Sequence, residues 1–109
     1  AYQAMDAWLK EGQRPQAVFA MSDTTAIGAI RALNDHGLRV PEDVSVIGFD
    51  GVELADFYTP RLCTMRQPSE RIAQASVELL LGCIEKKQPA RTLMLEAELV
   101  FGESVAERK

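Results

Sequence analysis

The apolar positions of residues 17–51 predict a strand, a helix and a second strand in succession. A short apolar run, AVFAM, is bounded by polar residues and is typical of a buried strand. Ser22-Asp23-Thr24 follows, with side-chain oxygens that can cap a helix, and apolar residues then recur at helical spacing until Gly37. A second apolar, β-branched run, VSVIGF, ends at Asp50-Gly51. Because the whole stretch has the length of a βαβ unit, its two strands are expected to lie parallel.

The flanking segments extend this pattern. Residues 1–11 have one apolar stripe and predict a helix, in which Trp8 is interpreted as a core or interface residue. A short helical turn is expected within residues 51–60, and a third strand is expected at residues 62–65. The tail at residues 92–101 alternates with period two and predicts one strand, or two that are broken near Glu96.

A long helix is predicted for residues 69–87, because Pro68 suits the start of a helix and the apolar residues keep a helical period. Its charged residues are expected to face solvent. Its buried face is expected to consist of the polar and apolar residues Ile72, Ser76, Val77, Leu79, Leu80, Leu81, Cys83 and Ile84.

The composition limits the class of protein. The 109 residues, 47% of them hydrophobic, allow one modest domain with a core of its own. A net charge of −4 argues against nucleic-acid binding by this stretch itself, and no apolar run is long enough to span a membrane. Cys63 and Cys83 follow no ligand or redox motif, so we interpret them as reduced packing residues, which favours a cytoplasmic protein.

Polar residues follow both central strands, at the end of a parallel sheet where ligands bind. Ser22 and Asp23 follow the first strand, and Asp50 ends the second. A carboxylate can accept two hydrogen bonds from neighbouring hydroxyls, whereas it would repel a phosphate. The pattern therefore predicts a neutral ligand rich in hydroxyl groups. For Asp50 ligand binding is the favoured role, and for Asp23 helix capping is favoured.

Motifs for other chemistry are missing from the sequence. It has no glycine-rich nucleotide loop, no Cys/His metal spacing and no GxSxG elbow. His36 is the only histidine and falls in the last turn of a predicted helix, where a cation suits the helix dipole. Asp23 and Asp50 could form an acid/base pair, but no nucleophile accompanies them. We therefore expect no catalytic residue, no metal, no cofactor and no enzyme activity.

Three segments of the chain closely resemble the LacI/GalR family of bacterial transcription regulators. They are AVFAMSDTTAIGAIRAL, HGLRVPEDVSVIGFDGVELADFYTPRLCTMRQP, and the SVELLL helix with the final ELV strand. Together they run nearly end to end in the family's order and spacing. The resemblance covers the later part of such a regulator's effector domain.

The resemblance implies an α/β fold with the parallel-sheet lobes of a periplasmic-binding-protein-like type I fold, present here as an incomplete fragment. Residues 1–65 would belong to the C-terminal lobe. Residues 68–90 would form a helix that crosses to the N-terminal lobe, and residues 92–101 would return. The helix-turn-helix DNA-binding domain would lie upstream, absent from this chain.

The resemblance also implies roles for six residues. Asp50 and Ser22 match positions that contact the effector, and Ser69 and Ile72 match positions that line the pocket after the crossover. Ile27 and Tyr58 match positions in the family's dimer interface, although a core position suits Ile27 equally well.

The expected function is effector sensing and dimerisation in a cytoplasmic repressor. A small molecule, with a sugar favoured over a nucleoside or purine, would bind between the lobes and alter operator affinity. The homodimer would contact operator DNA only through the missing N-terminal domain. The main alternative is a solute-binding protein of a sugar transport system. A phospho-receiver domain ranks lower, because none of the four lysines stands where such a domain needs one.

Overall fold

The computed structural model describes residues 1–107, which form two compact units. The first unit contains Ala1–Arg66 together with the segment that starts at Leu99, and the second contains Gln67–Glu98. Each unit is built around a different kind of structure: a sheet in the first, one long helix in the second.

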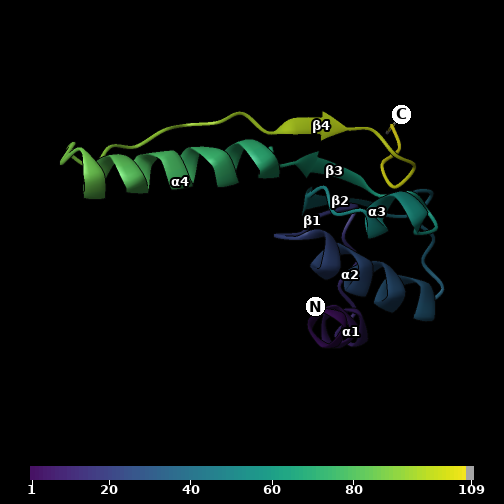
Figure 1. Ribbon diagram of the computed structural model, residues 1–109. Helices are drawn as coiled ribbons and strands as arrows, with labels where there is room; N and C mark the ends of the chain where they lie inside the picture. Colours follow the sequence, from purple (N-terminus) through teal and green to yellow (C-terminus); the bar gives the residue numbers. More distant parts are fainter. Residues whose placement is uncertain (108–109) are drawn as a thin grey trace. The chain divides into compact units, whose positions relative to one another are not determined.

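The sheet of the first unit has the strand order β1-β2-β3-β4. β1 (Ala17–Phe19), β2 (Ser45–Asp50) and β3 (Cys63–Arg66) run parallel, whereas the arrow of β4 (Glu98–Val100) points the opposite way in Figure 1. In this register Phe19 lies beside Ile47, and Asp50 lies beside Arg66. The predicted parallel strands and the predicted third strand are thereby confirmed.

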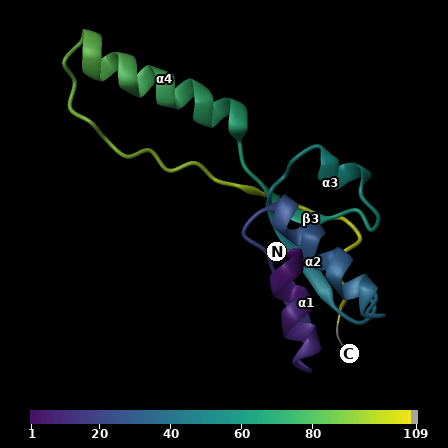
Figure 2. The ribbon, with the colours of Figure 1, turned by 90° about the horizontal axis from the view of Figure 1, so that it is seen from below.

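Two helices cover the sheet in successive layers. α2 (Asp23–Asp35) lies between the strands and α1 (Tyr2–Lys10), as both ribbon views show (Figures 1 and 2). Ile30 and Leu33 of α2 pack with Val46 of β2 in the core, and all three side chains are fully buried. Burial of each such side chain contributes about 1.5–3 kcal/mol to folding. α3 (Leu54–Phe57) forms the predicted short helical turn after β2.

The segment after β4 is bound to the first unit by hydrogen bonds. The hydroxyl of Ser104, which is 0% exposed, donates to the carbonyl of Val46 and accepts from the Cys63 amide at 2.8 Å. The Val46 amide in turn donates to the Ser104 carbonyl at 2.8 Å. Ser104 therefore links β2 to β3. It lies after residues 92–101, the part of the tail whose alternating pattern predicted structure.

The second unit consists of α4 (Ser69–Glu85) and the chain that returns from its end, which Figure 2 shows as a long loop. The predicted helix is confirmed, but its predicted buried face is wrong for the described residues. Only Ala75 of α4 is buried, and Leu80 and Ile84 are 59% and 65% exposed. The physical reason is that the second unit has no other helix or sheet to cover the apolar stripe of α4, because the chain that returns from its end forms neither over residues 87–97. Strand structure in the tail is likewise limited to β4.

Trp8 is not a core residue, because its side chain is 52% exposed. It lines an apolar hollow of about 380 Å³ between α1, β1 and α2, together with the exposed Phe19 and Met21. An exposed apolar group of this kind is typical of an interface, the other interpretation that its position on the stripe allowed. Within residues 1–107, no helix combines the length and the apolar character that crossing a membrane requires.

Candidate functional site

The site is centred on the edge where the parallel strands β1 and β2 end. The Ala20 amide donates to the Ile47 carbonyl at 2.9 Å and extends the pairing of the two strands past Phe19. After β1 the chain reaches Ser22, where α2 begins. After β2 it reaches the turn at Asp50 and Gly51. The two predicted polar groups therefore lie at the same end of the sheet.

Ser22 is the N-cap of α2. Its hydroxyl oxygen accepts a hydrogen bond from the Thr25 amide at 3.1 Å and donates to the Thr25 hydroxyl at 2.8 Å. This confirms that the polar cluster caps the helix, which such a bond stabilises by about 1 kcal/mol. Ser22 is half-buried, and its predicted contact with an effector stays a prediction.

Asp50 ends β2 in an unusual backbone conformation. Its φ angle is 118°, and Gly51 follows with a φ of 76°. A non-glycine residue in this region costs of the order of 1–3 kcal/mol, and such costs concentrate at functional sites. At Gly51 a side chain is excluded as well, because an added Cβ would lie 2.6 Å from the Cβ of Arg66. The turn therefore requires glycine at position 51 and holds Asp50 in a strained conformation.

Asp23 connects the two strand ends, a role that differs from the helix capping favoured by the sequence. Its Oδ2 atom accepts hydrogen bonds from the amides of Gly51 at 2.9 Å and Val52 at 2.8 Å. Its Oδ1 atom accepts from the Thr64 hydroxyl at 2.6 Å. Asp23 is fully buried, so its carboxylate faces the protein interior.

A sequence signal for this role exists in hindsight. Gly48 interrupts the β-branched run of β2, and glycine inside a strand often marks the close approach of another group. An added Cβ at Gly48 would overlap the Oδ1 atom of Asp23. The glycine thus marks the place where the carboxylate lies, whereas nothing in the sequence identified Thr64 as its partner.

The other two predicted pocket residues belong to the second unit. Ser69 is the first residue of α4 and is exposed, and Ile72 lies one turn later with 37% of its surface exposed. Both side chains are available to a ligand, but their part in a pocket stays a prediction.

The predicted dimer residues lie on two elements of the first unit. Ile27 of α2 is half-buried, and Tyr58, which follows α3, is packed in part against the core. Beside Tyr58, the side chains of Leu54 and Phe57 are 59% and 76% exposed. α3 therefore presents an apolar surface to solvent next to the predicted interface residue.

Residues 1–105 match the profile of the family described as periplasmic binding protein-like domain. The chain belongs to this family. It is 42% identical over 107 residues to the HTH-type transcriptional repressor PurR of Proteus mirabilis, a match that covers 97% of this chain and 31% of PurR. The chain thus spans about a third of the length of the curated relatives it matches.

Two solved structures extend the likeness of this periplasmic-binding-protein-like chain to its fold. The lac repressor dimer bound to operator and the anti-inducer ONPF is 33% identical, with a TM-score of 0.91 over 97% of this chain and 37% of that one. A LacI family transcriptional regulator from Arthrobacter sp. FB24 in complex with lactose is 34% identical, with a TM-score of 0.84 over 96% and 41%. The resemblance to LacI-family regulators and the expected fold class are confirmed. These relatives are transcription regulators rather than enzymes, as the sequence predicted.

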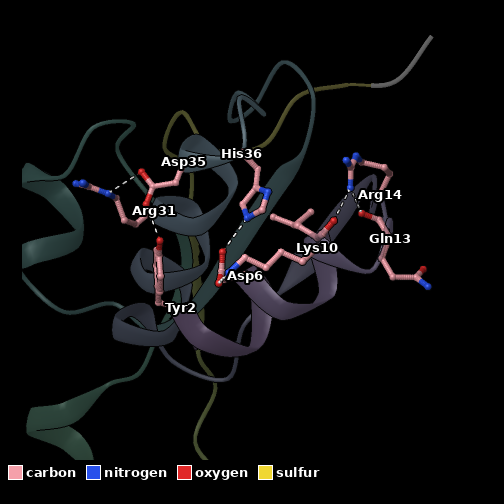
Figure 3. A network of polar contacts seen from close by, with 9 residues as sticks. Tyr2, Asp6, Lys10, Gln13, Arg14, Arg31, Asp35 and His36 are labelled. Atoms are coloured by element: carbon pink, nitrogen blue, oxygen red, sulfur yellow. Dashed lines mark hydrogen bonds and ion pairs between the residues drawn. The ribbon is translucent and has the colours of Figure 1, made fainter.

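A second polar cluster of this periplasmic-binding-protein-like chain lies away from the strand ends, between α1 and α2 (Figure 3). The hydroxyl of Tyr2 donates to Asp35 at 2.7 Å, and Arg31 forms an ion pair with Asp35 at 3.1 Å. The hydrogen bond to the Asp35 carboxylate raises the pKa of Tyr2 above its usual value. His36 lies at the C-terminal end of α2, as the sequence predicted, and its ring also contacts Asp6 of α1.

The side chains at the strand ends are hydrogen-bonding groups. In residues 1–107, no three His, Cys, Asp or Glu side chains gather as they would around a metal ion. Asp50 and Ser22 supply hydrogen-bonding groups at one edge, while the buried Asp23 accepts hydrogen bonds from the two amides that directly follow Asp50. This arrangement suits the binding of a small polar molecule.

Proposed function

We propose that this chain is part of the effector-binding domain of a LacI/GalR-type transcription regulator. The observation that carries the proposal is Asp50, which is placed at the carboxyl end of a parallel sheet in a conformation that costs free energy. The likeness to PurR and to the lac repressor supports a regulator over a solute-binding protein of a transport system. The whole protein would be cytoplasmic.

In this proposal Asp50 accepts hydrogen bonds from the effector, and Ser22 contacts it from the start of α2. A carboxylate accepts equally from sugar hydroxyls and from the ring N–H groups of a purine. The sugar expected from the sequence is supported by the lactose complex of the Arthrobacter regulator, whereas the PurR relatives favour a purine. Both classes satisfy Asp50, so the test includes both.

The two units would belong to different lobes of the complete regulator. Residues 1–65 would form part of the C-terminal lobe, residues 68–90 would cross to the N-terminal lobe, and residues 92–101 would return. Ser69 and Ile72, both accessible on the first turns of α4, would then line the effector pocket from the crossing helix. The apolar face of α4 would be covered by the strands of the N-terminal lobe.

Ile27 and Tyr58 would contribute to a homodimer interface. The exposed apolar side chains of Leu54 and Phe57 support this part of the proposal, because they enlarge the apolar surface beside Tyr58. A dimer would place two DNA-binding heads side by side on an operator, through a helix-turn-helix domain upstream of these residues.

Effector binding would then act by shifting a population. An effector that prefers one arrangement of the lobes changes the fraction of regulator whose heads fit the operator. A coupling free energy of about 1–3 kcal/mol between the two sites would change operator affinity about 5–150-fold.

The test replaces Asp50 by alanine in the full-length regulator. Operator binding is titrated in the presence of lactose, maltose, guanine and hypoxanthine, and the unmodified protein identifies which of them acts. We expect Asp50→Ala to abolish the response while basal operator binding stays nearly intact. Asp35→Ala is the matched control, because the Asp35 carboxylate belongs to the polar cluster between α1 and α2, where it bonds to Tyr2 and Arg31. An unchanged response curve in Asp50→Ala would reject the proposal.

A further inference from the structure

The carboxylate of Asp23 is buried completely and forms all of its described hydrogen bonds outside its own helix. Three donors meet its two oxygens: the amides of Gly51 and Val52, and the hydroxyl of Thr64. A buried carboxylate is unfavourable unless hydrogen bonds replace its water, so these bonds are needed for the fold to accept it. Two of them fix consecutive peptide groups directly after Asp50.

The neighbouring strand leaves room for this carboxylate. Gly48 lies inside β2, and an added Cβ there would overlap Asp23 Oδ1 and come within 3.0 Å of the Leu62 side chain. Glycine weakens a strand interior, since it packs no side chain and gains freedom on unfolding. Two features that each cost stability therefore meet here: Gly48 inside β2, and the buried carboxylate of Asp23 at the start of α2.

The turn that Asp23 holds is the one that carries the strained residue. Asp50 has a φ of 118° and Gly51 a φ of 76°. A non-glycine residue stays in this region only when its surroundings hold it there. The hydrogen bonds from Gly51 and Val52 to Asp23 fix the two peptide groups that follow the strained one.

We propose that Asp23 is a positioning residue for effector binding, which sets the turn of Asp50, Gly51 and Val52 without touching the effector. This rests on the proposed function, in which Asp50 contacts the effector. Without Asp23 the turn would populate several conformations, and the effector would have to select the competent one. If that conformation fell to a tenth of the population, affinity would fall about tenfold.

The test measures effector affinity and turn order separately in the full-length regulator. The probes are lactose, maltose, guanine and hypoxanthine, and the one that binds the unmodified protein most tightly by calorimetry is used for all variants. Asp23→Ala is expected to weaken binding about tenfold or more. It is also expected to speed hydrogen exchange at the Gly51 and Val52 amides, which the free protein reports without any probe.

A conservative variant distinguishes positioning from simple stabilisation. In Asp23→Asn the amide oxygen can still accept from both backbone amides, and its NH2 group can donate to the Thr64 hydroxyl. We expect Asp23→Asn to recover most of the affinity that Asp23→Ala loses. Ile30→Val is the control, because Ile30 is fully buried in α2 and shares none of these bonds. It should lower the unfolding midpoint and leave probe affinity unchanged.

The outcomes separate this inference from the function on which it rests. If Asp50→Ala loses probe affinity but folded Asp23→Ala retains it, the positioning role is wrong and the proposed function stands. If Asp50→Ala also binds normally, or if no probe binds the unmodified protein, the proposed function is wrong. In that case hydrogen exchange at the Gly51 and Val52 amides still decides whether Asp23 orders the turn. Should Asp23→Ala fail to fold, the near-isosteric Thr64→Val takes its place, and unchanged affinity and exchange in that variant would overturn the inference.

Discussion

The Nε2 atom of His36 lies 2.8 Å from the Oδ1 atom of Asp6, which joins the end of α2 to the middle of α1. Lys10 approaches the other oxygen of the same carboxylate at 2.9 Å. The hydrogen bond from His36, followed by that from Lys10, lowers the pKa of Asp6 below its ordinary value of 3.8. Together with the hydrogen bond from Tyr2 to Asp35, the contact between Asp6 and His36 therefore attaches α1 to α2 (Figure 3).

Asp6→Asn should change how stability depends on pH. Because folding lowers the pKa of Asp6, its contribution to stability is complete above 3.8 and is lost as the pH falls through the lower, folded-state pKa. The variant lacks this contribution, so its melting temperature should be lower at neutral pH and should fall less steeply below 3.8. Thermal melts across that range measure both effects. Parallel melting curves of variant and unmodified protein against pH would contradict the account.

Ser104→Ala should destabilise the first unit. The substitution leaves the Cys63 amide without its acceptor and the Val46 carbonyl without the hydroxyl donor, both in the interior. The expected loss is about 1–3 kcal/mol in the free energy of unfolding, measured by urea titration. Ser76→Ala on the exposed surface of α4 is the matched control and should change little. Equal midpoints for the two variants would show that Ser104 is not structural.

Phe57→Ser should weaken self-association of the full-length regulator without unfolding it. Phe57 is 76% exposed, so its loss removes little from the core of one chain. Tyr58→Asp should also weaken the dimer, but Tyr58 packs partly against the core and its replacement lowers stability as well. Sedimentation equilibrium measures the association. Phe101→Ser is the control, since Phe101 is 81% exposed and lies outside α3. If Phe57→Ser, Tyr58→Asp and Phe101→Ser all form dimers as stable as that of the unmodified protein, α3 is not part of the interface.

Much of the first unit follows from periodicity in the sequence. The apolar runs before Ser22 and Asp50 predicted both strands and their direction, because each was short, apolar and followed by polar residues. Asp50 could be selected on the same grounds, since its place at a strand end depends only on local pattern. Its backbone conformation could not, because φ follows from contacts made across the fold.

What the sequence did not give depends on contacts between distant residues. Asp23 and Thr64 are separated by 41 positions, and no local pattern pairs an aspartate with one particular threonine. The apolar stripe of α4 shows a similar limit, because it indicates that a face favours burial but not which segment covers it. Ser104 was missed for a related reason: a polar residue near a chain end is ordinarily exposed.

The backbone at Asp50 has an evolutionary consequence. Glycine adopts a φ of 118° without penalty, so the residue best suited to folding at this position differs from the residue proposed to recognise the effector. Relief of about 1–3 kcal/mol would outweigh the cost of about 0.5–1 kcal/mol that glycine adds through its freedom in the unfolded chain. A library of variants selected only for heat resistance should therefore enrich Asp50→Gly, whereas selection for inducible gene expression should return aspartate. The residue found at position 50 would therefore show whether a lineage has been selected for stability or for effector recognition.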